Sequence, residues 1–195
     1  MAKRFRSYQK LRDCLKSESG ISAVEFALIA PLMAMIYFGC IELSLMMTLD
    51  RKVTGATAAL GDLTSRASSV TNGDLEDIFE ATRMVMQPND MTQSRMRITS
   101  LYEDGGQVKV AWSDGCNLTA YTTDQVLTIP DNLIPTAGTI IMAEIEYDYV
   151  SGIGYFFSSS KTLTDKFYLR PRRVDAITRD RSDGTFSCAY TPSTP

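Results

Sequence analysis

"SESGISAVEFALIAPLMAMIYFGC", residues 17–40, is an apolar stretch that carries a carboxylate close to its start. From Phe26 to Ile41 no side chain is charged, and accepting Glu42 extends the apolar run to Leu49. A helix of about two dozen residues reaches roughly 36 Å at 1.5 Å per residue, which is enough to cross a hydrocarbon core of about 30 Å. The stretch therefore predicts a membrane-spanning helix.

Charge is distributed unevenly along the 195 residues, which carry a formal net charge of −3. Residues 1–20 hold six basic and two acidic side chains, a net of +4, and subtracting that from −3 leaves −7 for residues 21–195. Basic residues that flank a membrane span tend to stay on the cytoplasmic side. This asymmetry predicts a basic cytoplasmic leader, a single span and a head on the outer side of the membrane.

Glu25 is the feature that a plain membrane anchor does not explain. A carboxylate at bilayer depth costs a few kcal/mol, so it suggests a functional role with a charged partner. If the chain is cut after Gly20, Ile21 becomes the first residue and Glu25 the fifth, followed by Phe26. The cut creates an ammonium group that attracts Glu25 in low dielectric, whether it belongs to the same chain or to a neighbour.

This arrangement resembles the leader peptides of type IV pilins and, more narrowly, the TadE/TadF-like minor pseudopilins of the tight-adherence (Tad, or Flp) pilus system. The matching features are Val24-Glu25-Phe26-Ala27, Pro31 and Phe38-Gly39-Cys40-Ile41-Glu42. The resemblance is strong over residues 17 to about 70. It is weaker in the C-terminal half, where a strand-rich stretch ends in "TLTDKFYLRPR".

The resemblance implies that an aspartic-type prepilin peptidase of the bacterial inner membrane removes the leader after Gly20. The mature protein would then serve pilus biogenesis and surface adherence, with the peptidase, other Tad subunits, the inner-membrane assembly platform and membrane lipid as its partners. An uncleaved single-pass anchor, with a periplasmic head that binds a partner or ligand, remains the alternative. The choice between the TadE and TadF branches stays open, as does entry into the filament.

Beyond the span, the same helix is expected to continue. Pro31 lacks an amide hydrogen, which predicts a mild kink inside the span. Glu42, near the far membrane edge, is expected to reach water and receives less functional weight than Glu25. Apolar residues then recur at spacings of four and three, which predicts a helix that packs on its own head. They are Leu49, Val53, Ala56, Leu60, Leu63, Ala67 and Val70.

The expected organisation is a leader (1–20), a transmembrane helix (21–49), its extracytoplasmic continuation (50–72) and a head (73–195). The fold class is α+β, with a long protruding N-terminal helix packed on a small antiparallel β-sheet.

Within the head, Asp74 is a plausible cap for a helix over about 75–87, which Pro88 closes. Residues 115–138 predict one short helical turn and proline-bounded loops. Alternating apolar and polar residues predict four strands. They lie within residues 96–102, 108–112, 141–149 and 163–169.

Two cysteines test the topology of the head. Cys14 would leave with the leader and Cys40 lies in the span, so Cys116 and Cys188 face the outer compartment. An oxidising compartment favours a disulfide between them, with free buried thiols as the alternative. Closing a loop of some seventy residues adds roughly 4 kcal/mol of stability in the entropy model.

Nothing in the sequence supports catalysis, a metal, a cofactor or a small-molecule substrate. The chain has no histidine, which removes the usual general base and the commonest metal ligand. Asp180, Asp183 and Gly184 match only a fragment of a calcium loop, so we expect a surface turn there.

Two surface features remain for the head. A basic cluster is expected to form a solvated face or a subunit contact rather than a nucleic-acid surface. It comprises Arg170, Arg172, Arg173, Arg179 and Arg181. Tyr155, Phe156 and Phe157 lie in a predicted loop, where docking to a partner or the membrane and core packing are equally plausible.

Overall fold

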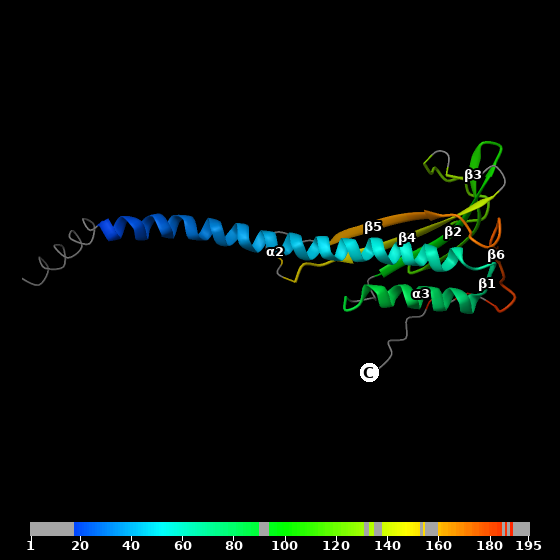
Figure 1. Ribbon diagram of the computed structural model, residues 1–195, viewed down its shortest axis with the longest axis horizontal. Helices are drawn as coiled ribbons and strands as arrows, with labels where there is room; N and C mark the ends of the chain where they lie inside the picture. The colour runs from blue at the N-terminus through cyan, green and yellow to red at the C-terminus, as the bar shows by residue number, and fades with distance from the viewer. Residues whose placement is uncertain are drawn as a thin grey trace, which may run out of the picture.

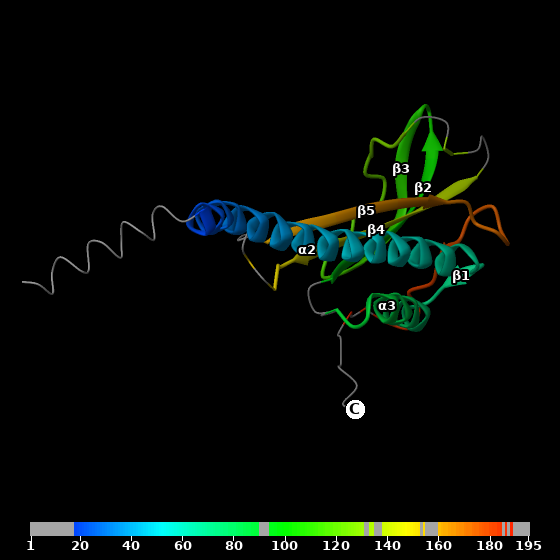
Figure 2. The same ribbon diagram turned by 60° about the vertical axis from the view of Figure 1, so that its left-hand side comes forward.

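The computed structural model describes residues 18–89, 94–130, 133–134, 138–152, 154, 160–184, 186 and 188. Its first element is α2 (Glu18–Ser65), a helix of 48 residues whose N-terminal half projects away from the rest of the molecule (Figure 1). The C-terminal half lies against a small sheet, with the second helix, α3 (Asn72–Met86), beside it (Figures 1 and 2). This is the predicted α+β layout.

Four strands form an antiparallel sheet in the order β3-β2-β4-β5. They are β2 (Ser94–Asp104), β3 (Gln107–Cys116), β4 (Thr139–Tyr149) and β5 (Lys161–Leu169). All four predicted strands are confirmed. The turn between β2 and β3 consists of Gly105 and Gly106, with φ angles of 61° and 79°. Positive φ at both positions is what a tight two-residue hairpin turn requires, and glycine adopts it without strain.

The strand register determines which end of the sheet faces the projecting half of α2. Ser94 pairs with Tyr147, and Tyr149 pairs with Lys161. The start of β2, the end of β4 and the start of β5 therefore share one end of the sheet, and the β2–β3 turn lies at the other. Figure 1 shows that the shared end points along α2 toward its projecting half.

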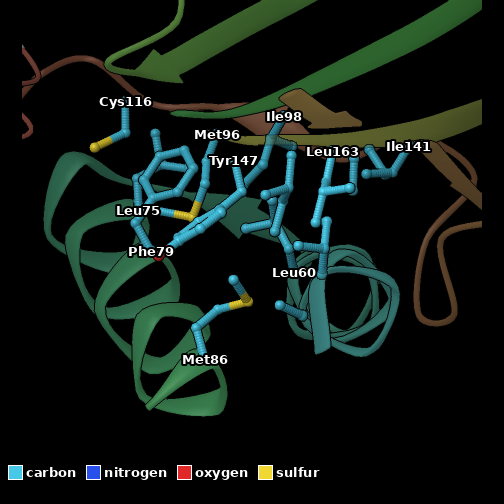
Figure 3. Packing of buried hydrophobic residues seen from close by; sticks show 14 of the residues in the cluster. Leu60, Leu75, Phe79, Met86, Met96, Ile98, Cys116, Ile141, Tyr147 and Leu163 are labelled. Atoms are coloured by element: carbon cyan, nitrogen blue, oxygen red, sulfur yellow. The ribbon is translucent and has the colours of Figure 1, made fainter. Parts of the chain in front are cut away.

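One face of the sheet packs against both helices to form the main core. Figure 3 shows Ile98, Ile141 and Leu163 pointing toward Leu60 of α2, while Tyr147 and Met96 lie over α3. Buried core residues of α2 and α3 are Leu49, Val53, Ala56, Leu60, Leu75, Phe79 and Met86. The first four confirm the predicted apolar seam over the part of the helix that reaches the sheet.

The end of α2 differs from the prediction. The seam was expected to continue through Val70, but the helix ends at Ser65 and Val70 belongs to a short strand, β1 (Ser69–Val70), paired in parallel with β6 (Thr178–Arg179). The Ser65 carbonyl, which has no partner within the helix, accepts a hydrogen bond from the Arg172 amide. Near that end Leu63 is 37% exposed and the buried position belongs to Thr64.

The start of α3 also corrects the prediction, because Thr71 rather than Asp74 is the N-cap. The Thr71 hydroxyl accepts from the Asp74 amide, and the Asp74 carboxylate accepts from the Thr71 amide, which makes a capping box. Hydrogen bonds from the Thr71 backbone and side chain lower the pKa of Asp74. The helix ends at Met86, just before Pro88, as predicted.

The predicted helical turn within 115–138 is absent from the described part of that segment. Instead, part of this segment runs antiparallel along the free edge of β3, where Leu127 donates its amide to the Val108 carbonyl. It covers a smaller core of Leu101, Val110, Ile140 and Met142. Part of the sheet is therefore apolar on both faces.

Candidate functional site

The N-terminal half of α2 leaves large apolar side chains uncovered. Ile21, Val24, Phe26 and Leu28 are 58%, 68%, 72% and 78% exposed. The helix contains a window of mean hydropathy 2.0, none of which is buried. Contiguous apolar surface of this kind marks an interaction or membrane surface. This half of α2 is long and apolar enough to span a membrane.

The residues around the proposed cleavage site lie on the first turns of α2. Ile21 and Glu25 are four residues apart, so they are neighbours on one face of the helix. Helical side chains lean toward the N-terminus, which carries the Glu25 carboxylate over the turn that contains Ile21. Glu25 is exposed and has no hydrogen-bond or ion-pair partner among the residues that the structure describes. The site offers an unpaired carboxylate one turn from the Gly20–Ile21 bond.

Pro31 lies within the same helix, which is continuous through it. The ring removes the amide that would otherwise donate to the Ala27 carbonyl. The kink stays a prediction.

Glu42 corrects an expectation, because it does not reach water. Its side chain is 0% exposed, and Oε1 accepts a hydrogen bond of 2.8 Å from the Ser151 hydroxyl in the chain that follows β4. Met46 and Glu42 precede Leu49 by three and seven residues, so all three lie on one face of the helix. Glu42 is the most N-terminal residue of the face of α2 that packs against the head. The same spacing extended toward the N-terminus would have identified it in the sequence.

A buried ionic cluster lies on the sheet face opposite the helices. Glu144 is only 2% exposed and lies between Arg97 and Lys166, its direct neighbours on the adjacent strands. Each cation approaches a different carboxylate oxygen at 2.7 Å. Burial raises the pKa of Glu144, but the hydrogen bonds from Arg97 and Lys166 outweigh burial, so the pKa is lowered overall. The cluster joins three strands.

Three arginines of the predicted basic cluster form ion pairs within the fold. Arg172 pairs with Asp62 on α2, and Arg179 pairs with Asp114 at 2.8 Å while its side chain is 2% exposed. Arg181 approaches the same Asp114 at 3.3 Å. These contacts hold the C-terminal segment against α2 and β3. The side chains of Arg172 and Arg181 are still 56% and 53% exposed, so they form part of the expected solvated face, whereas Arg179 is buried and departs from it.

The turn near Asp183 is exposed, as predicted, and it is tied to the start of α3 because the Asp183 carboxylate accepts a hydrogen bond from the Asn72 amide. Within the described residues, no group of three histidine, cysteine, aspartate or glutamate side chains could hold a metal ion.

Cys116 and Cys188 come together at the end of β3. Their Cα atoms are 5.2 Å apart, within the range that a disulfide spans, and the structure joins their sulfur atoms. Phe186 packs on Phe79 of α3 with ring centroids 5.7 Å apart. The C-terminal segment is thereby fixed beside α3. Cys14, Tyr155, Phe156 and Phe157 lie outside the described residues.

The fold and site define a class of protein in which one long apolar helix carries a compact α+β head. Within that class, residues 20–60 match the family described as TadE-like protein, which confirms the resemblance seen in the sequence. The TadE-like family comprises structural pilus components rather than enzymes, and it suggests a component associated with the Tad pilus. No curated protein and no solved structure matches the chain.

Replacing Glu144 by alanine should destabilise the head by about 3 kcal/mol, because it leaves Arg97 largely buried without its carboxylate. The folded pKa of Glu144 is lowered, so its contribution is present above the unfolded value of about 4.3 and is lost as the pH falls through the folded value. The difference between the two proteins should therefore shrink in acid.

Urea unfolding of the full chain in detergent, followed by Trp112 fluorescence at neutral pH and at about pH 3, measures this difference. The matched control is Glu103→Ala at an exposed position of β2, which should change stability by less than about 0.5 kcal/mol. Equal neutral-pH midpoints for the wild type and Glu144→Ala would show that the cluster does not stabilise the head.

Proposed function

We propose that this protein is a minor pseudopilin of the Tad pilus, anchored in the bacterial inner membrane and cleaved after Gly20 by a prepilin peptidase. The supporting observation is that the TadE-like match at residues 20–60 includes the uncovered half of α2, with Glu25 one turn from Ile21. The basic residues before Gly20 favour a cytoplasmic leader and therefore a periplasmic head.

Glu25 acquires its role when the leader is removed. The new ammonium of Ile21 carries a positive charge in a medium where opposite charges attract strongly. In the membrane, the ammonium of the same chain is one helical turn away. In an assembly, the ammonium of a neighbouring chain can replace it, so the pair favours packing of one apolar helix against another at a defined axial level.

The exposed apolar side chains near Glu25 determine which other molecules this half of the helix contacts. Phe26 and Leu28 are exposed in the isolated chain and contact lipid tails in the membrane, or other pilus subunits after assembly. The alternative function is an uncleaved envelope anchor with a partner-binding head. Such an anchor would also span the membrane, but it would not require cleavage of the Gly20–Ile21 bond.

Cleavage separates the two functions. In cells with an intact prepilin peptidase, mass spectrometry of the purified protein should find Ile21 as the N-terminus. Cells that lack the peptidase provide the control and should retain a terminus at Met1 or Ala2. An uncleaved terminus in both strains would contradict the pseudopilin function and favour the anchor.

Glu25→Ala should leave membrane insertion intact and abolish pilus assembly. Removing a carboxylate from the span should ease insertion, whereas the partner of the new ammonium is lost. Membrane fractionation and electron microscopy of pili measure the two effects. Ser22→Ala, which changes an uncharged polar residue in the same turn, is the matched control. Normal piliation by Glu25→Ala would remove the role assigned to this carboxylate.

We also propose that the Cys116–Cys188 disulfide is present in the mature protein. The support is the 5.2 Å separation of their Cα atoms and an oxidising periplasm. Alkylation of the denatured, unreduced protein followed by peptide mapping should modify Cys40 and leave Cys116 and Cys188 unmodified until a reductant is added. Alkylation of all three without reductant would show free thiols.

A further inference from the structure

We propose that the head rests on the outer surface of the membrane through the chain that follows β4, with Val150, Ser151 and Gly152 at the level of the phospholipid headgroups. This inference rests on the proposed membrane span of α2. It goes further because it assigns the head a second contact, with a phospholipid surface, and fixes the orientation of the sheet relative to the membrane.

The level of Glu42 along α2 is the first step. Counted from Ile21 at 1.5 Å per residue, Glu42 lies about 31 Å along the helix, where a hydrocarbon core of about 30 Å ends. Counted from Phe26, the same boundary falls near Met46 and places Glu42 inside the hydrocarbon. A helix tilt of about 20° sets Glu42 deeper still. By each of these estimates, Glu42 lies at the level of the phospholipid headgroups or deeper in the membrane.

The second step is the hydrogen bond that joins this level of α2 to the head. A carboxylate at the hydrocarbon boundary is costly unless a donor satisfies it. The Ser151 hydroxyl donates to Glu42 at 2.8 Å, and the Gly154 amide donates to the Ser151 oxygen at 3.1 Å. Because Glu42 is fully buried, this part of the head must descend to the same level as the carboxylate.

The figures agree with this placement. In both views the chain after β4, drawn in yellow, lies beside α2 at the end of the head that faces the projecting half of the helix (Figures 1 and 2). Val150, next to Ser151, is 71% exposed. An uncovered valine at this level is compatible with lipid and unfavourable in water.

A recess that begins about one turn beyond Glu42 along α2 also supports a lipid partner. It has a volume of about 220 Å³, and its apolar wall is formed by Leu45 and Leu49 of α2 together with Tyr149. Lys52 and Asn89 supply polar groups to the same lining. Tyrosine and lysine beside apolar residues are typical of the interface between hydrocarbon and water.

The opposite end of the sheet has a different character. Glu103 and Asp104 are exposed beside the β2–β3 turn, which the strand register places farthest from the end of β4. The charged turn therefore points away from the membrane.

Depth-dependent fluorescence quenching tests this orientation. Single cysteines replace Leu28, Val150 or Glu103 in the full chain carrying Cys14→Ser and Cys40→Ser, and each is labelled with an environment-sensitive fluorophore. The proteins are reconstituted in vesicles of phosphatidylethanolamine and phosphatidylglycerol that contain lipids with a nitroxide at the headgroup or midway along the acyl chain. Leu28 should be quenched by the acyl-chain nitroxide and Val150 by the headgroup nitroxide, each several-fold more strongly than Glu103.

The outcomes distinguish failure of the proposed membrane contact of the head from failure of the proposed membrane span of α2. Quenching at Leu28 with no more quenching at Val150 than at Glu103 would leave the span standing and overturn the membrane contact of the head. Absence of quenching at Leu28 would overturn the span and the inference together. Ser151→Ala, which removes the hydroxyl that donates to Glu42 from the head, should weaken headgroup quenching at Val150 several-fold and leave Leu28 unchanged. Unchanged quenching at Val150 would show that this hydrogen bond does not set the level of the head.

Discussion

A single helix that must satisfy two different surroundings is the constraint on which the rest of this structure depends. From Ile21 to Phe38 the large apolar side chains of α2 are uncovered, and from Glu42 to Leu60 one face of the same helix packs against the head. The first half needs lipid or other helices, whereas the second half needs the sheet. No loop separates the two halves, so in the proposed membrane span the helix itself would fix the position of the head relative to the membrane.

Polar contacts determine where the two halves meet. Glu25 lies near the start of the uncovered segment, and Glu42 near its end is enclosed by the head through Ser151. Beyond Glu42, the ion pair between Arg172 and Asp62 holds the C-terminal segment on α2. These contacts oppose sliding of the helix along the sheet, because movement by one turn would leave a buried carboxylate without its donor.

Local patterns in the sequence predicted the strands and the TadE-like segment, because both depend on neighbouring residues. Alternation in Ile141, Ala143 and Ile145 marks one covered face of β4, and Glu25 is recognised by its distance from Gly20. The helix end at Ser65 could not be predicted in this way, since it depends on Arg172, which is remote in the sequence.

The remaining differences have both long-range and local causes. Glu42 accepts a hydrogen bond from a serine that follows it by 109 residues, although the helical spacing back from Leu49 already places Glu42 on the buried face. The buried position of Arg179 depends on Asp114, which is remote in the sequence. Thr71 and Asp74 are both good caps, and only the completed capping box shows which of them begins α3.

The central claim, that one continuous helix passes from lipid into the head, is tested most directly by a nitroxide scan along the exposed face of α2 in reconstituted vesicles. Labels at Phe26, Leu28 and Tyr37 should be accessible to oxygen and shielded from a water-soluble nickel complex, and labels at Asp50 and Thr54 should show the reverse. A crossover between Glu42 and Thr48 would support the account. Nickel accessibility at every labelled position would contradict it.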